Sequence, residues 1–266
     1  MKYKNIILNT AMVFSIASIW TTNLHEFGHF VAAKLLHAQT VVQCHNAVSY
    51  QTTNMPLSSL ITIAATGPLT SLILAILFHF ICIAYPKRNY LFCFLVYMSS
   101  FCYISFFGYL CIAPFFPGGD TGFVFNSLGL PIWLIVIIAV AGGIPGYLLI
   151  KKTLRPLLLE LASTDVLEES TERQTFIQSI LTYPLFIGVI ITTLLTFPVQ
   201  VFLSVTYPLC SPFALFWGYN KFMSTLPIVK RSNPNFAAFT KFSVTVFVFF
   251  LLSVLSNRLL VFGLSW

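Results

Sequence analysis

Two histidines and a glutamate with the spacing of a metal site lie in one apolar stretch near the start of the chain. They are His25, Glu26 and His29. Side chains four positions apart on a helix project from the same face, one turn from each other, so the two imidazoles can hold one metal ion. Zinc suits them because it binds neutral imidazole nitrogens, and Glu26 can take a proton from a water that the metal activates. The spacing therefore predicts a hydrolytic zinc site.

A catalytic zinc has three protein ligands, so a third side chain is needed. Of the seven acidic residues, five fall between positions 160 and 172, which leaves Glu26 and Asp120. Asp120 follows a segment rich in proline and glycine, and such a segment lets non-helical backbone reach a cavity at membrane depth. Asp120 could also cap a following helix, and the two roles are compatible because a carboxylate has two oxygens. We expect Asp120 to be the third ligand.

The same residues could belong to a helix that carries them without any function. The surrounding sequence argues against this, because two imidazoles and a carboxylate inside an apolar span are costly unless something pairs them. Ionisable groups at such positions are therefore functional candidates.

The composition excludes an ordinary soluble protein, since 58% of the 266 residues are hydrophobic and 8% are charged. The net charge is +7, but Lys and Arg are scattered at the ends of apolar runs, which does not favour a nucleic-acid partner. A bilayer core of about 30 Å is crossed by roughly 20 helical residues. Six segments meet this requirement, at about 6–37, 58–85, 91–113, 131–150, 175–207 and 242–261.

We therefore expect an all-α, polytopic transmembrane bundle of about six spans, an integral multi-pass protein that would lie in the cell membrane if the protein is bacterial. The uncharged stretch 176–219 could instead form two spans. Residues 40–53 are β-prone and predict a short membrane-associated hairpin between the first two helices. Its edge could hold an extended substrate segment, or it could simply connect the helices. The expected organisation is a core at 1–150, a charged polar linker at 151–174 and accessory transmembrane helices at 175–266.

Three motifs in this order carry a resemblance. They are His25-Glu26-Phe27-Gly28-His29, Gly67-Pro68-Leu69-Thr70-Ser71 and Pro117-Gly118-Gly119-Asp120-Thr121-Gly122. In them the chain resembles the site-2 protease family of intramembrane zinc metalloproteases. The resemblance implies that Zn²⁺ is bound by His25, His29 and Asp120, and that Glu26 is the catalytic base. It also implies a three-helix core at about 6–128 and a substrate-binding role for Gly67, Pro68 and Ser71.

The chain departs from the family at three places. Ser71 stands where the family usually has an asparagine, Ile112 and Ala113 stand where it commonly has another, and Thr121 follows the aspartate directly. These departures concern the parts that hold the substrate more than the metal ligands. Gly67 and Ser71 also have a second explanation, because small residues four apart let membrane helices pack closely.

The predicted function is that of an intramembrane zinc metalloprotease. Its partners would be the lipid bilayer and a membrane-protein or peptide substrate, cleaved in or near its transmembrane segment. The alternatives are a membrane metal-binding or transport protein and a catalytically inactive, protease-like regulator. Transport favours paired sites in two related halves, and no second ligand cluster follows residue 130. Glu26 argues against both alternatives, because a site that only binds a metal needs no base.

Overall fold

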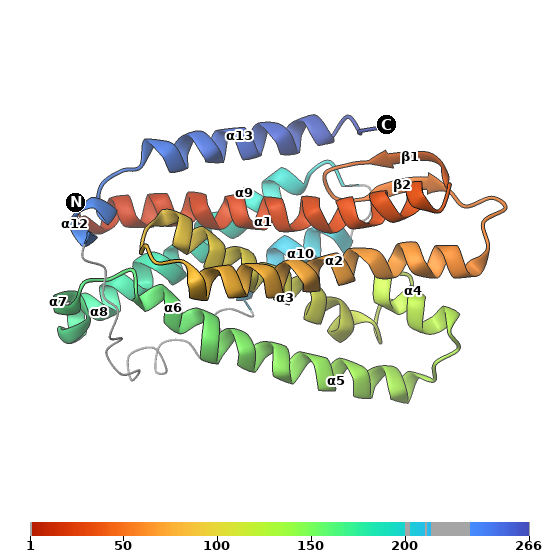
Figure 1. Cartoon of the computed structure of the whole chain (residues 1–266), viewed down its shortest axis with the longest axis horizontal. Coiled ribbons are helices and arrows are strands. Elements are labelled where there is room, and N and C mark those ends of the chain that lie inside the picture. Colours follow the sequence, from red (N-terminus) through yellow and green to blue (C-terminus); the bar gives the residue numbers. More distant parts are fainter. Residues whose placement is uncertain (1, 200–202, 211, 214–234, 266) are drawn as a thin grey trace.

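The computed structural model describes residues 2–199, 203–210, 212–213 and 235–265 of the chain. This part is mostly helical and contains one small two-stranded sheet (Figure 1). The elements of the first half are α1 (Lys2–Leu35), β1 (Gln39–Gln43), β2 (Val48–Gln51), α2 (Leu57–Ala84), α3 (Tyr90–Ile112), α4 (Asp120–Ser127) and α5 (Ile132–Leu149). They are followed by α6 (Arg155–Leu159), α7 (Thr164–Glu168), α8 (Ser170–Ile177), α9 (Tyr183–Thr196), α10 (Leu203–Cys210), α12 (Phe236–Phe239) and α13 (Val244–Leu260), with π-helical turns at Ile150–Leu154 and Gln178–Thr182.

Five helical stretches among the described residues are long and apolar enough to cross a membrane. They are Tyr3–Leu35, Leu57–Ala84, Tyr90–Ile112, Ile132–Leu159 and Ser170–Thr196. A sixth apolar helix, α13, has 17 residues and is shorter than these. Large apolar side chains such as Phe80 on α2, Trp133 on α5 and Phe249 on α13 are exposed, as expected for surfaces that face lipid. The prediction of a mostly helical protein with several helices able to cross a membrane is confirmed in this form, with five such helices among the described residues instead of about six.

The second half differs from the predicted segments in two places. The helix expected at 175–207 ends at Thr196, because Phe197 precedes Pro198 and adopts an extended conformation. The charged stretch 151–174, expected as a linker, is folded into the end of the α5 segment and the short helices α6, α7 and α8. Part of the expected accessory region, at 200–202, 211, 214–234 and 266, lies outside the described residues.

Helix α1 lies at the centre of the bundle and contacts α2, α3, α9 and α13 (Figure 1). Protein therefore surrounds it more than lipid does, and a buried polar side chain on it can find partners within the protein. Asn9 donates to the hydroxyl of Tyr90 and to the carbonyl of Lys241, and it accepts from the amide of Ser243. An apolar span can carry a polar group such as Asn9 at this position because the group is paired.

The strands β1 and β2 form an antiparallel pair between α1 and α2 in the chain, as the β-prone stretch predicts. At the outer edge of β1, Gln43 exchanges backbone hydrogen bonds with Leu264, from the end of the described chain. The sheet thus lies at the same end of the bundle as the C-terminal half of α1 (Figure 1).

Candidate metal centre

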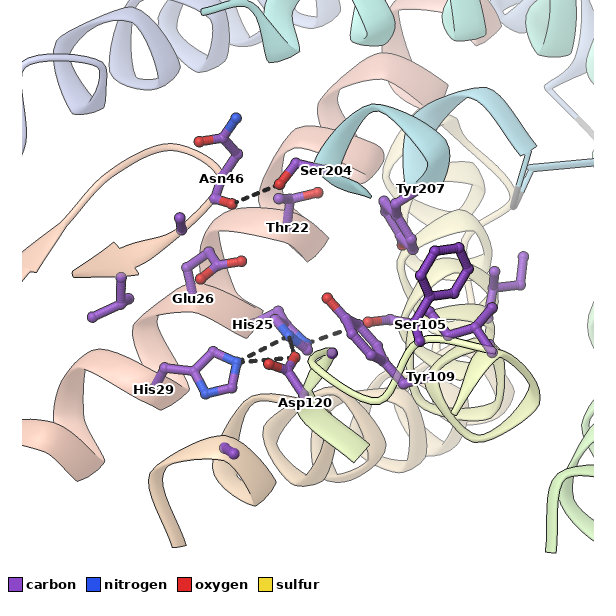
Figure 2. A pocket seen from close by; sticks show the side chains of 18 of the residues that line it. Thr22, His25, Glu26, His29, Asn46, Ser105, Tyr109, Asp120, Ser204 and Tyr207 are labelled. Atoms are coloured by element: carbon purple, nitrogen blue, oxygen red, sulfur yellow. Dashed lines mark hydrogen bonds and ion pairs between the residues drawn. The ribbon is translucent and has the colours of Figure 1, made fainter. Parts of the chain in front are cut away.

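Three side chains from two elements converge on one point inside the bundle (Figure 2). The Nε2 atoms of His25 and His29 lie 3.2 Å apart. The Oδ2 atom of Asp120 lies 3.0 Å from the Nε2 of His25 and 3.2 Å from that of His29. The two histidines are one turn apart on α1, and Asp120 is the first residue of α4. Their ligand atoms form a nearly equilateral triangle, a group that could hold a metal ion.

The hydrogen bond of the Nδ1 atom of His29 determines whether its Nε2 atom presents a hydrogen or a lone pair to this triangle. Its Nδ1 lies 2.7 Å from the carbonyl oxygen of Ile63 on α2. A carbonyl only accepts, so Nδ1 carries a hydrogen and donates it. In the neutral ring, Nε2 then presents its lone pair to the oxygen of Asp120 and to the other imidazole. Acceptors that face one another in this way need a positive charge between them.

His25 is held by hydroxyl groups rather than by a carbonyl. Its Nδ1 lies 3.0 Å from the Oγ of Ser71 and 3.4 Å from the Oγ of Ser105, and the two hydroxyls are 3.1 Å apart. The ring of Tyr109 stacks on the imidazole, with centroids 4.8 Å apart and planes inclined by 8°. Helices α2 and α3 thus fix the orientation of His25 from two sides, as neighbours of metal ligands commonly do.

Asp120 reaches the triangle because α4 begins at this residue. Gly119 is the N-cap, and the carboxylate of Asp120 is directed to the histidines instead of capping the helix. The hydroxyl of Thr121 donates to the carbonyl of Tyr109 at 2.5 Å, which ties the first turn of α4 to the last turns of α3. The threonine that separates Asp120 from Gly122 therefore anchors the ligand-bearing helix.

The residues of the Gly-Pro motif lie against the metal ligands. A Cβ atom on Gly67 would come within 2.1 Å of the Nε2 of His29, so only glycine leaves room for that ring. Ser71 bonds His25, as described above, and Pro68 is buried in α2. A Cβ on Gly28 would meet the Oγ1 of Thr70 at 2.4 Å, so α1 and α2 also approach closely. Close helix packing and support of the ligands thus occur together here.

Glu26 is buried and its carboxylate borders a cavity of about 920 Å³ that also contains the metal triangle (Figure 2). The carboxylate lies on the open side of His25, towards Thr22. No lysine or arginine is among the described residues that line the cavity. Two carboxylates therefore share a cavity to whose lining the described residues contribute no permanent positive charge.

The second half of the chain completes the cavity, which the sequence did not reveal. Thr192 and Thr196 of α9, Tyr207 of α10 and Asn257 of α13 all contribute to its lining. Thr192, Thr196 and Tyr207 sit in the uncharged stretch 176–219, and Asn257 lies next to Arg258 on α13. None of these side chains belongs to a motif, so no signal in the sequence could have identified them.

The tip of the hairpin connects the two halves. His45 Nε2 and Asn46 Nδ2 lie 2.9 and 3.1 Å from the carbonyl oxygen of Thr196, at the end of α9. Ser204 of α10 donates to the backbone carbonyl of Asn46 at 3.3 Å. Burial lowers the pKa of His45, the hydrogen bond to Thr196 raises it, and the charge of Arg258 lowers it to a smaller extent. Because a carbonyl only accepts, the ring donates to Thr196 through Nε2. The residues at the tip therefore fasten the hairpin to the end of α9.

Comparisons of the chain with protein-family models, with curated proteins and with solved structures give no match. The arrangement of the site itself therefore carries the functional argument.

Proposed function

We propose that this protein is an intramembrane zinc metalloprotease, similar in its site to the site-2 protease family, which hydrolyses a peptide bond in or near a transmembrane segment of its substrate. One observation carries the proposal. A buried glutamate borders a cavity inside a bundle of apolar helices, beside three converging metal-ligand atoms. A protein that only carries a metal has no use for this carboxylate.

The donor set and its dimensions support zinc. Two imidazole nitrogens and one carboxylate oxygen are ligands that zinc accepts, and three protein ligands leave a fourth position open. In a tetrahedral zinc site with bonds of about 2.0 to 2.1 Å, neighbouring ligand atoms are about 3.3 Å apart. The three atoms of this triangle are 3.0 to 3.2 Å apart. The triangle is therefore close to the size that zinc requires.

The charge of the cavity supports a divalent cation in general. Asp120 and Glu26 contribute two negative charges, and His29 directs a lone pair at Asp120. Buried charges of this kind are found paired or coordinated to metals, because an unpaired ion is costly in a low dielectric. A bound divalent ion would balance both carboxylates.

When bound, zinc supplies Lewis-acid polarisation of the peptide carbonyl and acidifies a coordinated water. Glu26 accepts a proton from the attacking water, whose oxygen forms a bond to the carbonyl carbon. As the C–N bond breaks, Glu26 returns that proton to the departing amine, so it ends the cycle ionised. His25, His29 and Asp120 would hold the ion, and Ser71 and Ser105 keep the ring of His25 in place.

The surroundings of the site suit a membrane-embedded peptide. A helical substrate shields its own peptide bonds, so it must unwind locally before the carbonyl can be attacked. Val48 and Tyr50 of β2 line the same cavity, so this strand offers a place where an unwound segment can lie extended. Thr22 and Thr192 add polar groups to the lining, which favours the presence of the water that hydrolysis consumes.

The test uses the full chain, purified and reconstituted in lipid nanodiscs with one zinc per chain. Synthetic single-span peptides with a glycine or proline in the span are added, and the products are identified by mass spectrometry. Glu26→Gln keeps the shape of the side chain but removes the base. We expect cleavage to fall at least about 10³-fold while zinc content is unchanged, within the range for loss of a general base.

Glu168→Gln is the matched control, because Glu168 is an exposed acid on α7, away from the cavity. This variant should cleave at the wild-type rate. Equal cleavage by wild type and Glu26→Gln would contradict the assignment of the base. Zinc binding without cleavage of any peptide would favour a metal carrier instead.

A further inference from the structure

Tyr109 occupies a position that its sequence context does not distinguish. It lies near the end of α3, and its ring is parallel to that of His25. Tyr109, Asp120 and Glu26 line the same cavity. Figure 2 shows the hydroxyl of Tyr109 directed into the open space beside His25 and Asp120, facing Glu26. The phenol thus borders the space that a reacting peptide bond would occupy.

Three other hydroxyl groups of the cavity are engaged with backbone carbonyls. Thr22 donates to Ser18, Thr192 to Gly188 and Tyr207 to Phe101. The hydroxyl of Tyr109 differs from these because it is directed into the open space of the cavity (Figure 2). A peptide carbonyl that enters the cavity would offer the phenol an acceptor there.

We propose that Tyr109 is a catalytic residue that donates a hydrogen bond to the oxygen of the scissile carbonyl. This inference rests on the proposed function. Attack by water turns the carbonyl oxygen into an anion, and a donor aimed at that oxygen stabilises the transition state more than the substrate. No bond is made or broken at Tyr109, because the phenol keeps its proton and Glu26 carries out the proton transfers.

The geometry around Tyr109 supports a fixed donor. The stacking on His25 restricts the ring on one face, and the backbone carbonyl of Tyr109 accepts from Thr121. These two contacts fix the position of the Tyr109 side chain relative to His25 on α1 and to α4, the helix that bears Asp120. A donor that is already oriented needs no reorganisation as charge develops in the transition state. Such preorganised donors are the most effective ones.

The test is Tyr109→Phe, which keeps the stacked ring and removes only the hydroxyl. Its substrate is a peptide that the wild-type protein cleaves in nanodiscs. We expect kcat to fall about 10² to 10³-fold, as for the loss of one oxyanion donor. KM and the dissociation constant for zinc should stay at their wild-type values. A phosphinic analogue of the same peptide, which imitates the tetrahedral state, should bind more weakly by a similar factor.

Tyr103→Phe is the matched control, because Tyr103 is a buried tyrosine of the same helix that does not line the cavity. It should leave kcat, zinc affinity and analogue binding unchanged. If Tyr109→Phe behaved like this control, the inference would be overturned. It would also be overturned if Tyr109→Phe lost zinc affinity and excess zinc restored its kcat, since Tyr109 would then act by positioning Asp120.

The two levels of the proposal can be separated. A wild-type protein that cleaves, with an inactive Glu26→Gln variant and a fully active Tyr109→Phe variant, would leave the proposed function standing and remove only the role of Tyr109. A wild-type protein that binds zinc and cleaves no peptide would overturn both.

Discussion

Two of the regions in which the bundle buries ionisable groups balance their charges in different ways. Near the end of α2, the Nε of Arg88 lies 2.5 Å from the Oε2 of Glu160 on the turn after α6, and the guanidinium also donates to the carbonyl of Tyr85. Near the other end of the bundle (Figure 1), the metal centre contains two carboxylates and two imidazoles, and its cavity lining includes no lysine or arginine among the described residues.

The difference separates a structural cluster from a functional one. Arg88 and Glu160 balance each other, so their region is complete without any ligand. The metal centre has an excess of acceptors, and its own side chains leave the negative charge of Glu26 and Asp120 without a fixed cation. Burial of charge alone therefore does not indicate a site. An imbalance of charge beside a cavity does, because it calls for a ligand of the opposite sign.

The largest effect is expected at the unbalanced region. Asp120→Asn keeps the shape of the side chain and removes the charge that favours the cation. Zinc content should fall from about one per chain to nearly none, and cleavage should be lost with it. Metal analysis of the purified protein measures the first effect. Full zinc occupancy in this variant would remove Asp120 from the ligand set.

A smaller but substantial effect is expected at the balanced region. Arg88→Met leaves Glu160 buried without its partner, which should cost about 3 to 5 kcal/mol of stability, measured by unfolding in mixed micelles. Zinc content should be unchanged. In the double variant Arg88→Met, Glu160→Met, much of the loss should be recovered, because no lone charge stays buried. If the double variant were as unstable as Arg88→Met, the instability could not be due to the unpaired charge of Glu160.

The smallest effect concerns the support of a ligand. Ser71→Ala removes one of the two hydroxyls that hold His25, and zinc affinity should fall about 10 to 100-fold, as for other neighbours of metal ligands. Competition with a chelator of known affinity measures it. Ser99→Ala is the control, because Ser99 is a buried hydroxyl on α3 that bonds the carbonyl of Ala75 away from the metal centre. Equal zinc affinity in both variants would assign Ser71 to packing alone.

The sequence singles out the three residues that converge in the structure because acidic residues are rare in it. Outside positions 160–172 only Glu26 and Asp120 are acidic, and the histidines have helical spacing. The structure brings His25, His29 and Asp120 together as expected. Helix limits in the first half are also close to those predicted, for example 57–84 against 58–85 for α2, which begins after Pro56 and ends shortly before Lys87 and Arg88.

The supporting residues could not be predicted in the same way. Ser105 and Tyr109 lie on α3, and their contacts with His25 depend on how two apolar helices are rotated against each other. Hydroxyl groups are common in such helices, and most bond their own backbone. The contact of His45 with Thr196 joins residues far apart in the chain, which periodicity cannot reveal. Tertiary packing decides these positions.

The contacts between residues 1–150 and the second half of the chain limit which sequence changes the protein can accept. A segment limited to 1–150 would contain every proposed zinc ligand and the base, yet α9, α10 and α13 form part of the cavity wall. The hairpin tip is bonded to the end of α9 as well. Exchanging either half for that of a related protein would join surfaces that were never fitted to each other, so the two halves must diverge in step.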